Sequence, residues 1–185
     1  HQAKLIPWIP FYKDTYEDEA KTVLNRNIYS RVKKENYNTQ VAENLYITDS
    51  YKDTMYQKIY DSELRNHKKY KYSDVGYYFI NEIIKKITFN SQDLIAENIY
   101  SKIGLQNIGY NPLNKWALNR ITPTENDTFF RHQLIHGYVH DQGAALLGGV
   151  GGHAGLFSNA NDLAVIMQMY LNKGTYGGDT ILNSD

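Results

Sequence analysis

The chain has 185 residues, of which 42% are hydrophobic, and this is enough for one domain with a buried core. Its 20 basic residues balance 20 acidic ones, so the positive charge typical of a nucleic-acid-binding protein is absent. The lack of cysteine excludes disulfide bonds, thiol catalysis and Cys-ligated zinc. No apolar run approaches the roughly 18 residues needed to cross a bilayer, so we expect no membrane span in this chain.

The spacing of apolar residues predicts the elements in chain order. Pro7 and Pro10 favour an extended path, because a proline disfavours helix in the residue before it. Helical spacing predicts helices over residues 16–32, 49–64, 75–87, 92–103 and 161–172. Beta-branched and aromatic residues predict a short strand within 41–47, and another follows a glycine turn at 180–182.

The chain is organised around the predicted helix over residues 75–87. Its apolar stripe repeats every four residues through Val75, Phe79, Ile83 and Ile87, with Ile80 and Ile84 beside it. Ser73 or Asp74 can cap the first turn, since a short side-chain oxygen accepts from the free backbone N–H groups there. The triplet Tyr72, Ser73 and Asp74 therefore stands at a helix entrance.

Three other predicted helices have an apolar face that we expect to be buried. These faces are Met55 and Ile59 with Tyr56 and Tyr60; Ile95, Ile99 and Ile103; and Leu163, Ile166, Met167, Tyr170 and Leu171. Gly104 stands where a helix end favours a left-handed residue, and Asn161 or Asp162 can cap the last helix. Residues 120–157 predict a long irregular stretch, rich in glycine over 148–155, and loops this long are usually functional or disordered.

Three segments together resemble a known family. The run YKYSDVGYYFINEII resembles the second motif of serine beta-lactamases and penicillin-binding-protein-like hydrolases, Tyr-x-Asn followed by a glycine and a helix. The run HGYVHDQGAALLGGVGGHAGLFSNANDLAVIMQMYLNKGTYGG is similar to the segment before the last active-site strand in the esterase-like, cell-wall-associated branch. The opening HQAKL resembles the loop after the nucleophile helix, with Lys4 where that pattern has glycine, so we expect an altered turn there.

The resemblance implies an α+β fold, mainly α in this chain. We expect the helical subdomain and connecting loops of the beta-lactamase/DD-peptidase-like fold, as a central fragment with the flanking sheet largely outside it. Residues 1–119 are the helical region with the Tyr-Ser-Asp motif, 120–160 the glycine-rich loop region, and 161–185 a helix and the start of the next strand.

The resemblance also implies roles for residues of the triplet. Tyr72, with its pKa lowered by a neighbouring ammonium, would shuttle the proton between nucleophile and leaving group, and Asp74 would be its positioning partner. Asp74 departs from asparagine, and an ionised carboxylate cannot donate to a substrate carbonyl. This disfavours beta-lactam hydrolysis and leaves ester or amide hydrolysis open. Further candidates for the substrate cleft are Ser73, His140, Asp141 and His153.

Two short patterns imitate the other motifs of the family. Ser30 and Lys33 match the Ser-x-x-Lys nucleophile pattern, but they follow the opening loop instead of preceding it. We therefore reject Ser30 and expect the nucleophile outside this chain. The sequence His153-Ala154-Gly155 imitates the third motif, but the glycines before it favour a tight loop leading to the last helix.

His132, His136 and His140 are spaced four apart, which on a helix would suit a zinc site. Gly137 and Val139 interrupt such a helix, so a zinc protein remains an alternative that we do not favour. We expect instead a His–Asp hydrogen bond that orders this loop, and we expect neither metal nor cofactor.

The parent protein is therefore expected to be a serine hydrolase that acts through an acyl-serine intermediate on an amide or ester. The resemblance implies a small-molecule or peptidoglycan-fragment substrate, a periplasmic or extracytoplasmic location, and fusion to or association with a glycosidase. Without nucleophile and third motif, this chain alone would be inactive. The alternative is a catalytically inactive hydrolase-like module that binds cell-wall glycopeptide, an alternative favoured by Lys4 and Asp74.

Overall fold

The computed structural model describes residues 1–183 as an α+β fold. Its α-helices are α1 (Tyr51–Tyr60), α2 (Val75–Thr88), α3 (Gln92–Lys102), α4 (Gln142–Leu146) and α5 (Ala160–Leu171). Its strands are β1 (Tyr29–Ser30), β2 (Thr39–Ala42), β3 (Leu45–Ile47), β4 (Gly109–Tyr110), β5 (Glu125–Asp127), β6 (Gln133–Ile135), β7 (Leu156–Phe157), β8 (Thr175–Tyr176) and β9 (Asp179–Thr180). Short 3₁₀ helices span Phe11–Asp14, Pro112–Asn114 and Leu118–Arg120. The α+β class is confirmed, whereas a mainly helical chain is not, because long irregular segments join the helices.

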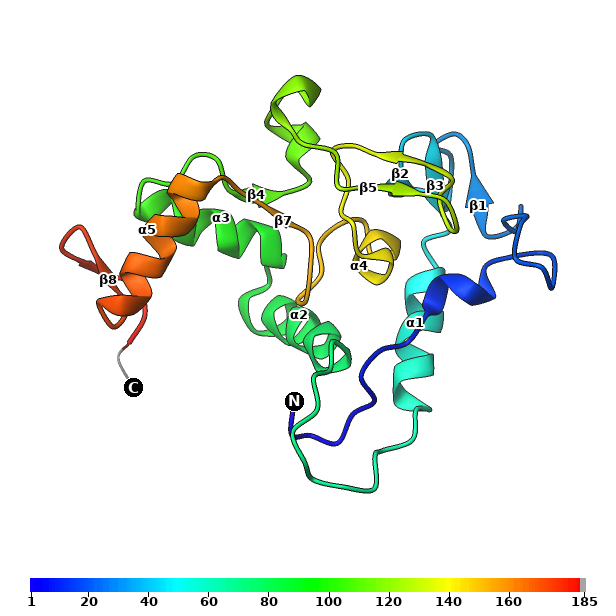
Figure 1. Ribbon diagram of the computed structural model, residues 1–185, viewed down its shortest axis with the longest axis horizontal. Coiled ribbons are helices and arrows are strands. Elements are labelled where there is room, and N and C mark those ends of the chain that lie inside the picture. The colour runs from blue at the N-terminus through cyan, green and yellow to red at the C-terminus, as the bar shows by residue number, and fades with distance from the viewer. Residues whose placement is uncertain (184–185) are drawn as a thin grey trace.

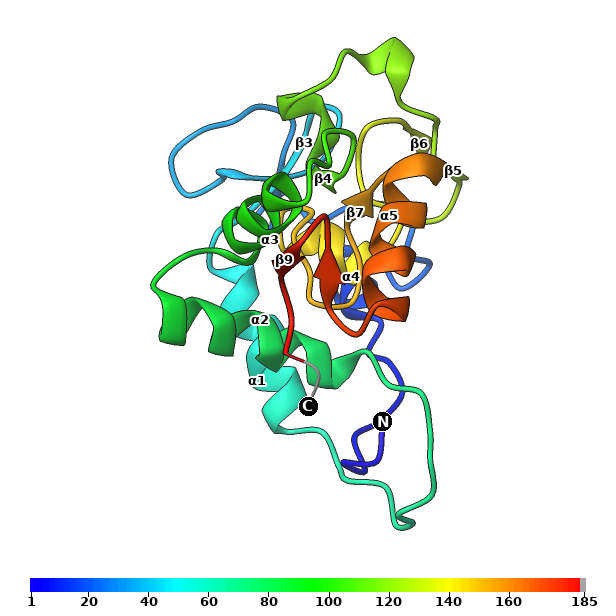
Figure 2. The ribbon, with the colours of Figure 1, turned by 90° about the vertical axis from the view of Figure 1, so that its left-hand side faces the viewer.

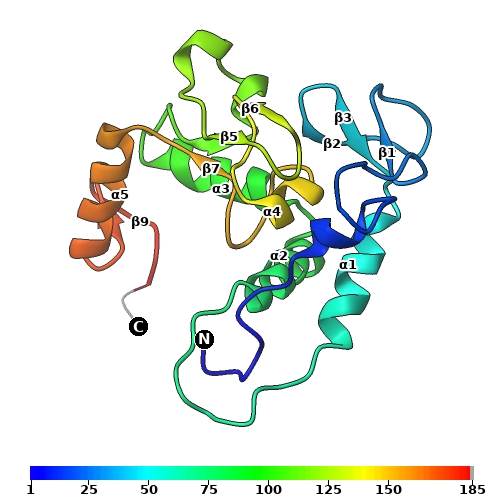
Figure 3. The ribbon, with the colours of Figure 1, turned by 45° about the vertical axis from the view of Figure 1, so that its right-hand side comes forward.

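Small antiparallel sheets are distributed along the molecule. The largest has the strand order β1-β3-β2, and the pairs β4-β7, β5-β6 and β8-β9 form the others. The three-stranded sheet lies at the opposite end of the molecule from α5 and β8, with α4 between them (Figures 1 and 3). In the view of Figure 2, α2 runs across the molecule below α3. Among residues 1–183, no helix is long and apolar enough to cross a membrane.

Two hydrophobic clusters hold these elements together. The larger joins the N-terminal segment, the β1-β3-β2 sheet, α1, the start of α2 and α4, and its least exposed members are Phe11, Val41, Ala42, Leu45, Ile47, Met55, Val75, Phe130, Ile135, Ala144, Ala145 and Leu146. The smaller cluster contains Ile103, Leu105, Ile108 and Met169, and it attaches α5 to the end of α3. Because α4 and the start of α2 belong to the same cluster, the larger core fixes the segments that carry the candidate site.

The structure confirms most of the predicted elements and corrects some of them. The helix expected over 16–32 is wrong: this segment makes turns, an isolated bridge between Tyr16 and Leu24, and strand β1. Its charged and apolar residues alternate at helical spacing, but Asp18 accepts backbone N–H groups of Thr22 and Val23 and so closes a loop instead. The strand expected over 41–47 is a hairpin of β2 and β3, and residues 120–157 contain β5, β6, α4 and the final β7.

The buried face of α2 differs from the predicted stripe. Val75 and Tyr78 are buried, whereas Ile83 is 50% and Ile87 72% exposed. Tyr78 was not counted as apolar, yet its ring packs against Phe11 at a centroid distance of 5.5 Å. An amphipathic tyrosine can fill a core position when its ring is covered, and this shifts the contact face of the helix.

The face predicted for α5 is also mostly exposed. Met169 is its buried apolar residue, whereas Met167 and Tyr170 are 59% and 60% exposed. The N-cap is Asn159, whose Oδ1 accepts from the backbone N–H of Asp162 at 2.8 Å, so Asn161 and Asp162 lie inside the helix. The Asp162 carboxylate is buried and accepts from the backbone N–H of Asn107 at 2.7 Å, which connects α5 to the segment after α3.

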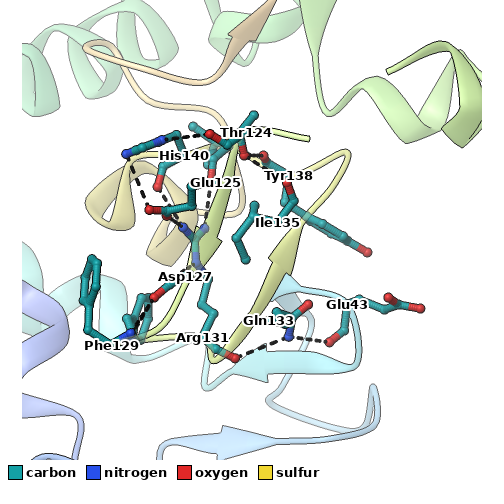
Figure 4. Close-up of polar contacts among 12 residues, drawn as sticks. Glu43, Thr124, Glu125, Asp127, Phe129, Arg131, Gln133, Ile135, Tyr138 and His140 are labelled. Atoms are coloured by element: carbon teal, nitrogen blue, oxygen red, sulfur yellow. Dashed lines mark hydrogen bonds and ion pairs between the residues drawn. The ribbon is translucent and has the colours of Figure 1, made fainter. Parts of the chain in front are cut away.

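A buried arginine organises the segment between β5 and α4 (Figure 4). Arg131 Nε donates to Asp127 Oδ2 at 2.8 Å, and its Nη2 lies 2.5 Å from Glu125 Oε1. The same guanidinium donates to the backbone carbonyls of Val139 at 2.7 Å and His140 at 2.8 Å. Burial disfavours the ionised form of Asp127, but the bonds from Arg131 and from backbone N–H groups hold its pKa below the usual range. Arg131 thus fixes the backbone immediately before residue 141.

We expect Arg131→Met to lower the free energy of unfolding by roughly 3–5 kcal/mol, because the buried Asp127 carboxylate would lose its partner. Chemical denaturation monitored by circular dichroism measures this change. The matched control is Arg120→Met, which removes an exposed guanidinium bonded only to Asn107 Oδ1. It should change stability by about 0.5 kcal/mol or less. Equal losses for both variants would show that the buried network does not stabilise the fold.

Candidate active site

The Tyr72–Asp74 segment lies where the loop after α1 enters α2. Asp74 occupies the N-cap position, but its side chain makes no capping hydrogen bond, so the predicted cap by Asp74 is wrong. Ser73 does not cap either, because its hydroxyl donates to the backbone carbonyl of Ile6 at 2.7 Å. Instead, the Asp74 carboxylate accepts from the Tyr72 hydroxyl, with 2.6 Å between Oη and Oδ1. The first and third residues of the triplet therefore form a hydrogen-bonded pair at the helix entrance.

This pairing changes the acidity of Tyr72. The hydrogen bond to Asp74 is the main cause, followed by partial desolvation and by the negative charge of Asp74, and together they raise the pKa of Tyr72 to about 12. The resemblance implied a pKa lowered by an ammonium, which is the opposite direction. No ion pair within residues 1–183 involves Asp74, so its carboxylate is free to pair with an ammonium.

The opening loop packs directly against the triplet. The backbone N–H of Ser73 donates to His1 Nδ1 at 3.1 Å, and that of Asp74 donates to the Pro7 carbonyl at 3.1 Å. The His1 ring lies 4.9 Å from the Tyr72 ring, measured between centroids. Sequence reasoning gave His1 no role, although the HQAKL pattern marked its loop. Lys4 has a φ of 62°, so the glycine-like turn is retained and the expected alteration is wrong.

A small cavity opens beside the triplet. Its volume is about 160 Å³, and its lining includes His1, Ser73, Tyr77 and Ile80. One wall is therefore the first turns of α2, and the other is the opening loop. The Tyr77 and Ile80 side chains are 36% and 44% exposed, so this side of α2 is accessible next to Tyr72.

Asp141 and His153 form the second polar pair of the site. His153 Nε2 lies 2.9 Å from Asp141 Oδ1, and the His153 side chain is only 3% exposed. Asp141 also caps α4 by accepting from the backbone N–H of Ala144 at 2.7 Å. Burial opposes ionisation of Asp141, but the hydrogen bonds from His153 and Ala144 outweigh it and lower the pKa of this carboxyl. The His–Asp hydrogen bond expected from the histidines at 132, 136 and 140 is not formed by them, because Asp141 pairs with His153 instead.

The glycine-rich loop is fastened to α2 by several contacts. The ring of His153 stacks on the ring of Tyr78, with centroids 4.5 Å apart. Asn81 Nδ2 donates to the Val150 carbonyl at 2.9 Å. Gly152 lies so close to the backbone of Tyr77 that an added Cβ would be 2.2 Å from the Tyr77 carbonyl oxygen. The glycine-rich loop that carries His153 is thus packed against the first two turns of α2, directly after the triplet.

The remaining predicted residues lie elsewhere. The side chain of His140 is 62% exposed, and its Nε2 lies 3.6 Å from Glu125 Oε2 (Figure 4). His132 precedes β6 and His136 follows it, so these histidines do not share a helix. No group of three or more His, Cys, Asp or Glu side chains within residues 1–183 is placed to hold a metal ion. Ser30 lies in β1 and donates to the Val32 carbonyl at 2.7 Å, without the helical turn that a Ser-x-x-Lys pair requires.

The two polar pairs of the site differ in accessibility. Tyr72 is 56% exposed, and its hydroxyl, which donates to Asp74, is accessible from solvent. In the Asp141–His153 pair the His153 side chain is buried and that of Asp141 is 26% exposed, and the pair makes no hydrogen bond to the triplet. It therefore orders the neighbouring loop, while the exposed Tyr72–Asp74 pair is where a reacting group can be reached.

Comparisons with known proteins agree on one family. The family model described as Beta-lactamase matches residues 23–185. A protein of Escherichia coli (strain K12) named "Putative D-alanyl-D-alanine carboxypeptidase" is 37% identical over 161 residues, which cover 80% of this chain and 37% of that protein. A Bacillus subtilis (strain 168) protein named "N-acetylmuramyl-L-alanine amidase" is 38% identical over 121 residues, covering 58% of this chain and 27% of that protein. The chain spans about a third of the length of these relatives.

We expect Gly152→Ala to destabilise the docked loop by about 1–3 kcal/mol, because the new methyl group would overlap the Tyr77 carbonyl. Thermal unfolding and hydrogen exchange at residues 149–154 measure the effect. Gly76→Ala is the matched control, since its Cβ would meet only Leu5 Cδ1 at 3.5 Å, an ordinary contact. It lies within α2 and should be neutral or stabilising by up to about 1 kcal/mol. Unchanged stability of the first variant would contradict the close packing.

Proposed function

Because the chain belongs to the Beta-lactamase family, we propose that it supplies the proton-transfer part of a serine hydrolase active site. The proposed reaction is cleavage of an amide bond in a peptidoglycan-derived fragment through an acyl-serine intermediate. The observation that carries this proposal is the Tyr72–Asp74 pair, with 2.6 Å between Oη and Oδ1 at the entrance of α2. The names of the carboxypeptidase and amidase relatives support an amide of cell-wall origin as the substrate.

The proposed role of Tyr72 depends on a cation from outside residues 1–185. With a pKa of about 12, the hydroxyl is a poor base at neutral pH while it donates to Asp74. An ammonium beside Asp74 would compensate the carboxylate and stabilise the tyrosinate, which lowers the pKa of Tyr72. A lysine from a Ser-x-x-Lys helix is such a cation. We therefore place both the nucleophilic serine and this lysine in another part of the protein.

The proton is then accounted for at each step. Tyr72 takes the proton of the serine hydroxyl while the serine oxygen forms a bond to the amide carbonyl carbon. The C–N bond breaks as Tyr72 returns the proton to the leaving nitrogen, which leaves an acyl-serine. Water attacks the acyl carbon by the reverse use of the same group and releases the acid. Asp74 accepts a hydrogen bond from the Tyr72 hydroxyl and pairs with the ammonium, and so keeps these two groups next to each other.

The other predicted residues have positioning roles in this proposal. Ser73 fixes the opening loop through the Ile6 carbonyl, and the Asp141–His153 pair fixes the glycine-rich loop against α2. The opening loop lies against Tyr72, and the glycine-rich loop lies against the first two turns of α2. His140 faces Glu125, and we assign it no part in the site.

The location and partners of the whole protein follow from the proposed substrate. Peptidoglycan lies outside the cytoplasmic membrane, so we propose a periplasmic or other extracytoplasmic location. We also propose association with, or fusion to, a glycosidase, since cleavage of the glycan chain by such an enzyme releases the sugar–peptide fragments on which the proposed amide cleavage would act.

One observation favours a second candidate, a catalytically inactive module that binds cell-wall glycopeptide. Asp74 raises the pKa of Tyr72, which suits a structural hydrogen bond better than proton transfer. Binding without turnover would need no lysine beside Asp74.

The test uses the full-length protein and its Tyr72→Phe variant, with N-acetylmuramyl-L-alanine and a D-alanyl-D-alanine peptide as substrates. We expect Tyr72→Phe to lower kcat by about 100-fold to 10,000-fold, the contribution of a positioned acid–base group. Tyr70→Phe is the matched control, because Tyr70 is exposed and two residues away, and it should leave kcat unchanged. A Tyr72→Phe variant as active as the wild type would contradict the role of Tyr72. Absence of turnover by the wild type, with glycopeptide binding retained, would favour the binding module.

A further inference from the structure

A second pocket lies apart from the cavity beside Ser73. It is bounded by β2, the 3₁₀ turn Pro112–Asn114 and the segments on either side of α4, and its volume is about 420 Å³. This is within the range of pockets that bind small ligands. Its lining contains no residue of the Tyr72–Asp74 segment and neither member of the Asp141–His153 pair. The proposed hydrolysis therefore gives this pocket no role.

Neutral hydrogen-bonding groups dominate the lining. Amide and hydroxyl side chains come from Asn38, Thr39, Gln40, Asn111, Asn114 and Tyr138, and Lys33 contributes the only formal charge in the lining. Amides and hydroxyls both donate and accept hydrogen bonds. A phosphate site would instead need several cations or a helix N-terminus. The lining thus suits a ligand with many hydroxyl and amide groups and little charge.

Hydrogen bonds between the walls hold these groups in place. Gln40 Nε2 donates to the Tyr138 hydroxyl at 2.8 Å, which ties β2 to the segment before α4. Asn111 Nδ2 donates to the Gly148 carbonyl at 3.0 Å, which ties the 3₁₀ turn to the segment after α4. A ligand therefore meets groups that are already ordered, and this reduces the entropy cost of binding.

Several polar atoms remain available to a ligand. The Tyr138 hydroxyl accepts from Gln40 and keeps its own proton to donate. Figure 4 shows the Tyr138 ring pointing away from the Arg131 network. Asn38 Nδ2 and Thr39 Oγ1 already donate to the Asp49 carboxylate, at 2.8 and 3.1 Å. Among residues 1–183, the side-chain donors of the lining that have no partner are therefore the Tyr138 hydroxyl, the Asn114 amide and the Lys33 ammonium. The pocket thus presents both donors and acceptors to a ligand, since an amide such as Asn114 has a carbonyl acceptor and an NH2 donor group.

Apolar contacts complete the chemistry of the pocket. Leu113 and Leu147 line it together with the ring of Tyr138. We propose that this pocket binds an N-acetylhexosamine unit of a glycan. An acetamido group carries a carbonyl acceptor, an N–H donor and a methyl group, and an amide next to two leucines complements all three. The sugar hydroxyls match the Tyr138 hydroxyl and the Lys33 ammonium as donors and the side-chain carbonyls of Asn38, Gln40 and Asn111 as acceptors.

This inference goes beyond the proposed amide cleavage, because it places sugar binding in a pocket separate from the Tyr72 site. It deepens the second candidate, the glycopeptide-binding module, on which it partly rests, by assigning a sugar site. It predicts that the chain recognises glycan whether or not the parent protein hydrolyses it. The pocket and the Tyr72 site can therefore fail independently in experiment.

The test is calorimetric titration of the purified protein with the trisaccharide of N-acetylglucosamine. We expect saturable binding, and weaker binding of maltotriose, which has hydroxyls but no acetamido group. Asn114→Ala and Tyr138→Phe should each raise Kd for the acetylated trisaccharide by about 5-fold, as expected for loss of one hydrogen bond. Asn98→Ala and Tyr60→Phe are matched controls at exposed positions on α3 and α1, and they should leave Kd unchanged.

Thermal unfolding separates loss of binding from loss of fold. Asn114 is exposed, so Asn114→Ala should keep the wild-type Tm and still bind more weakly. Equal affinity for both trisaccharides would overturn the assignment of an acetamido site. Failure of the wild type to bind the acetylated sugar, or unchanged affinity of Asn114→Ala and Tyr138→Phe, would overturn the proposal as a whole. None of these results depends on turnover, so the proposed hydrolase function is tested separately.

Discussion

The close contact between Gly152 and the backbone of Tyr77 is the constraint on which the candidate site depends. A side chain at position 152 would overlap the Tyr77 carbonyl, so only glycine lets the loop reach α2 at this distance. Once the loop is there, His153 stacks on Tyr78 and binds Asp141, and Asp141 caps α4. Arg131 supports the same arrangement from the other side by holding the carbonyls of residues 139 and 140. The position of the glycine-rich loop therefore depends both on its close packing against α2 and on the buried ion pairs of Arg131.

The electrostatics of the triplet depend on what approaches it. Within the described residues, Asp74 faces only the Tyr72 hydroxyl, and the resulting pKa of about 12 belongs to a proton donor at neutral pH. A cation beside Asp74 would reverse this preference, because it stabilises the tyrosinate and compensates the carboxylate. The same two residues can thus serve as a structural pair or as an acid–base pair. We propose that a cation from outside this chain decides between these two roles.

Sequence reasoning located the elements better than their contacts. Helices α1, α2, α3 and α5 follow from apolar spacing, and Gly104 has the left-handed conformation expected at the end of α3. The spacing of apolar residues could not reveal that Tyr78 belongs to the buried face of α2. Its burial depends on Phe11 and His153, which are far away in the sequence. The network of Arg131 was also missed, since a lone arginine between two short strands has no sequence signature. The resemblance identified Tyr72, Asp74, Asp141 and His153 as candidates, but it did not indicate that the last two pair with each other.

The central claim is that this chain provides the proton-transfer residues, while the nucleophilic serine lies in another part of the protein. The most direct test labels the full-length protein with a fluorophosphonate probe and maps the adduct by peptide mass spectrometry. The account predicts one adduct on a serine outside residues 1–185, formed more slowly in Tyr72→Phe. An adduct on Ser30, Ser73 or another serine of this chain would contradict it, and so would a full-length protein that forms no adduct.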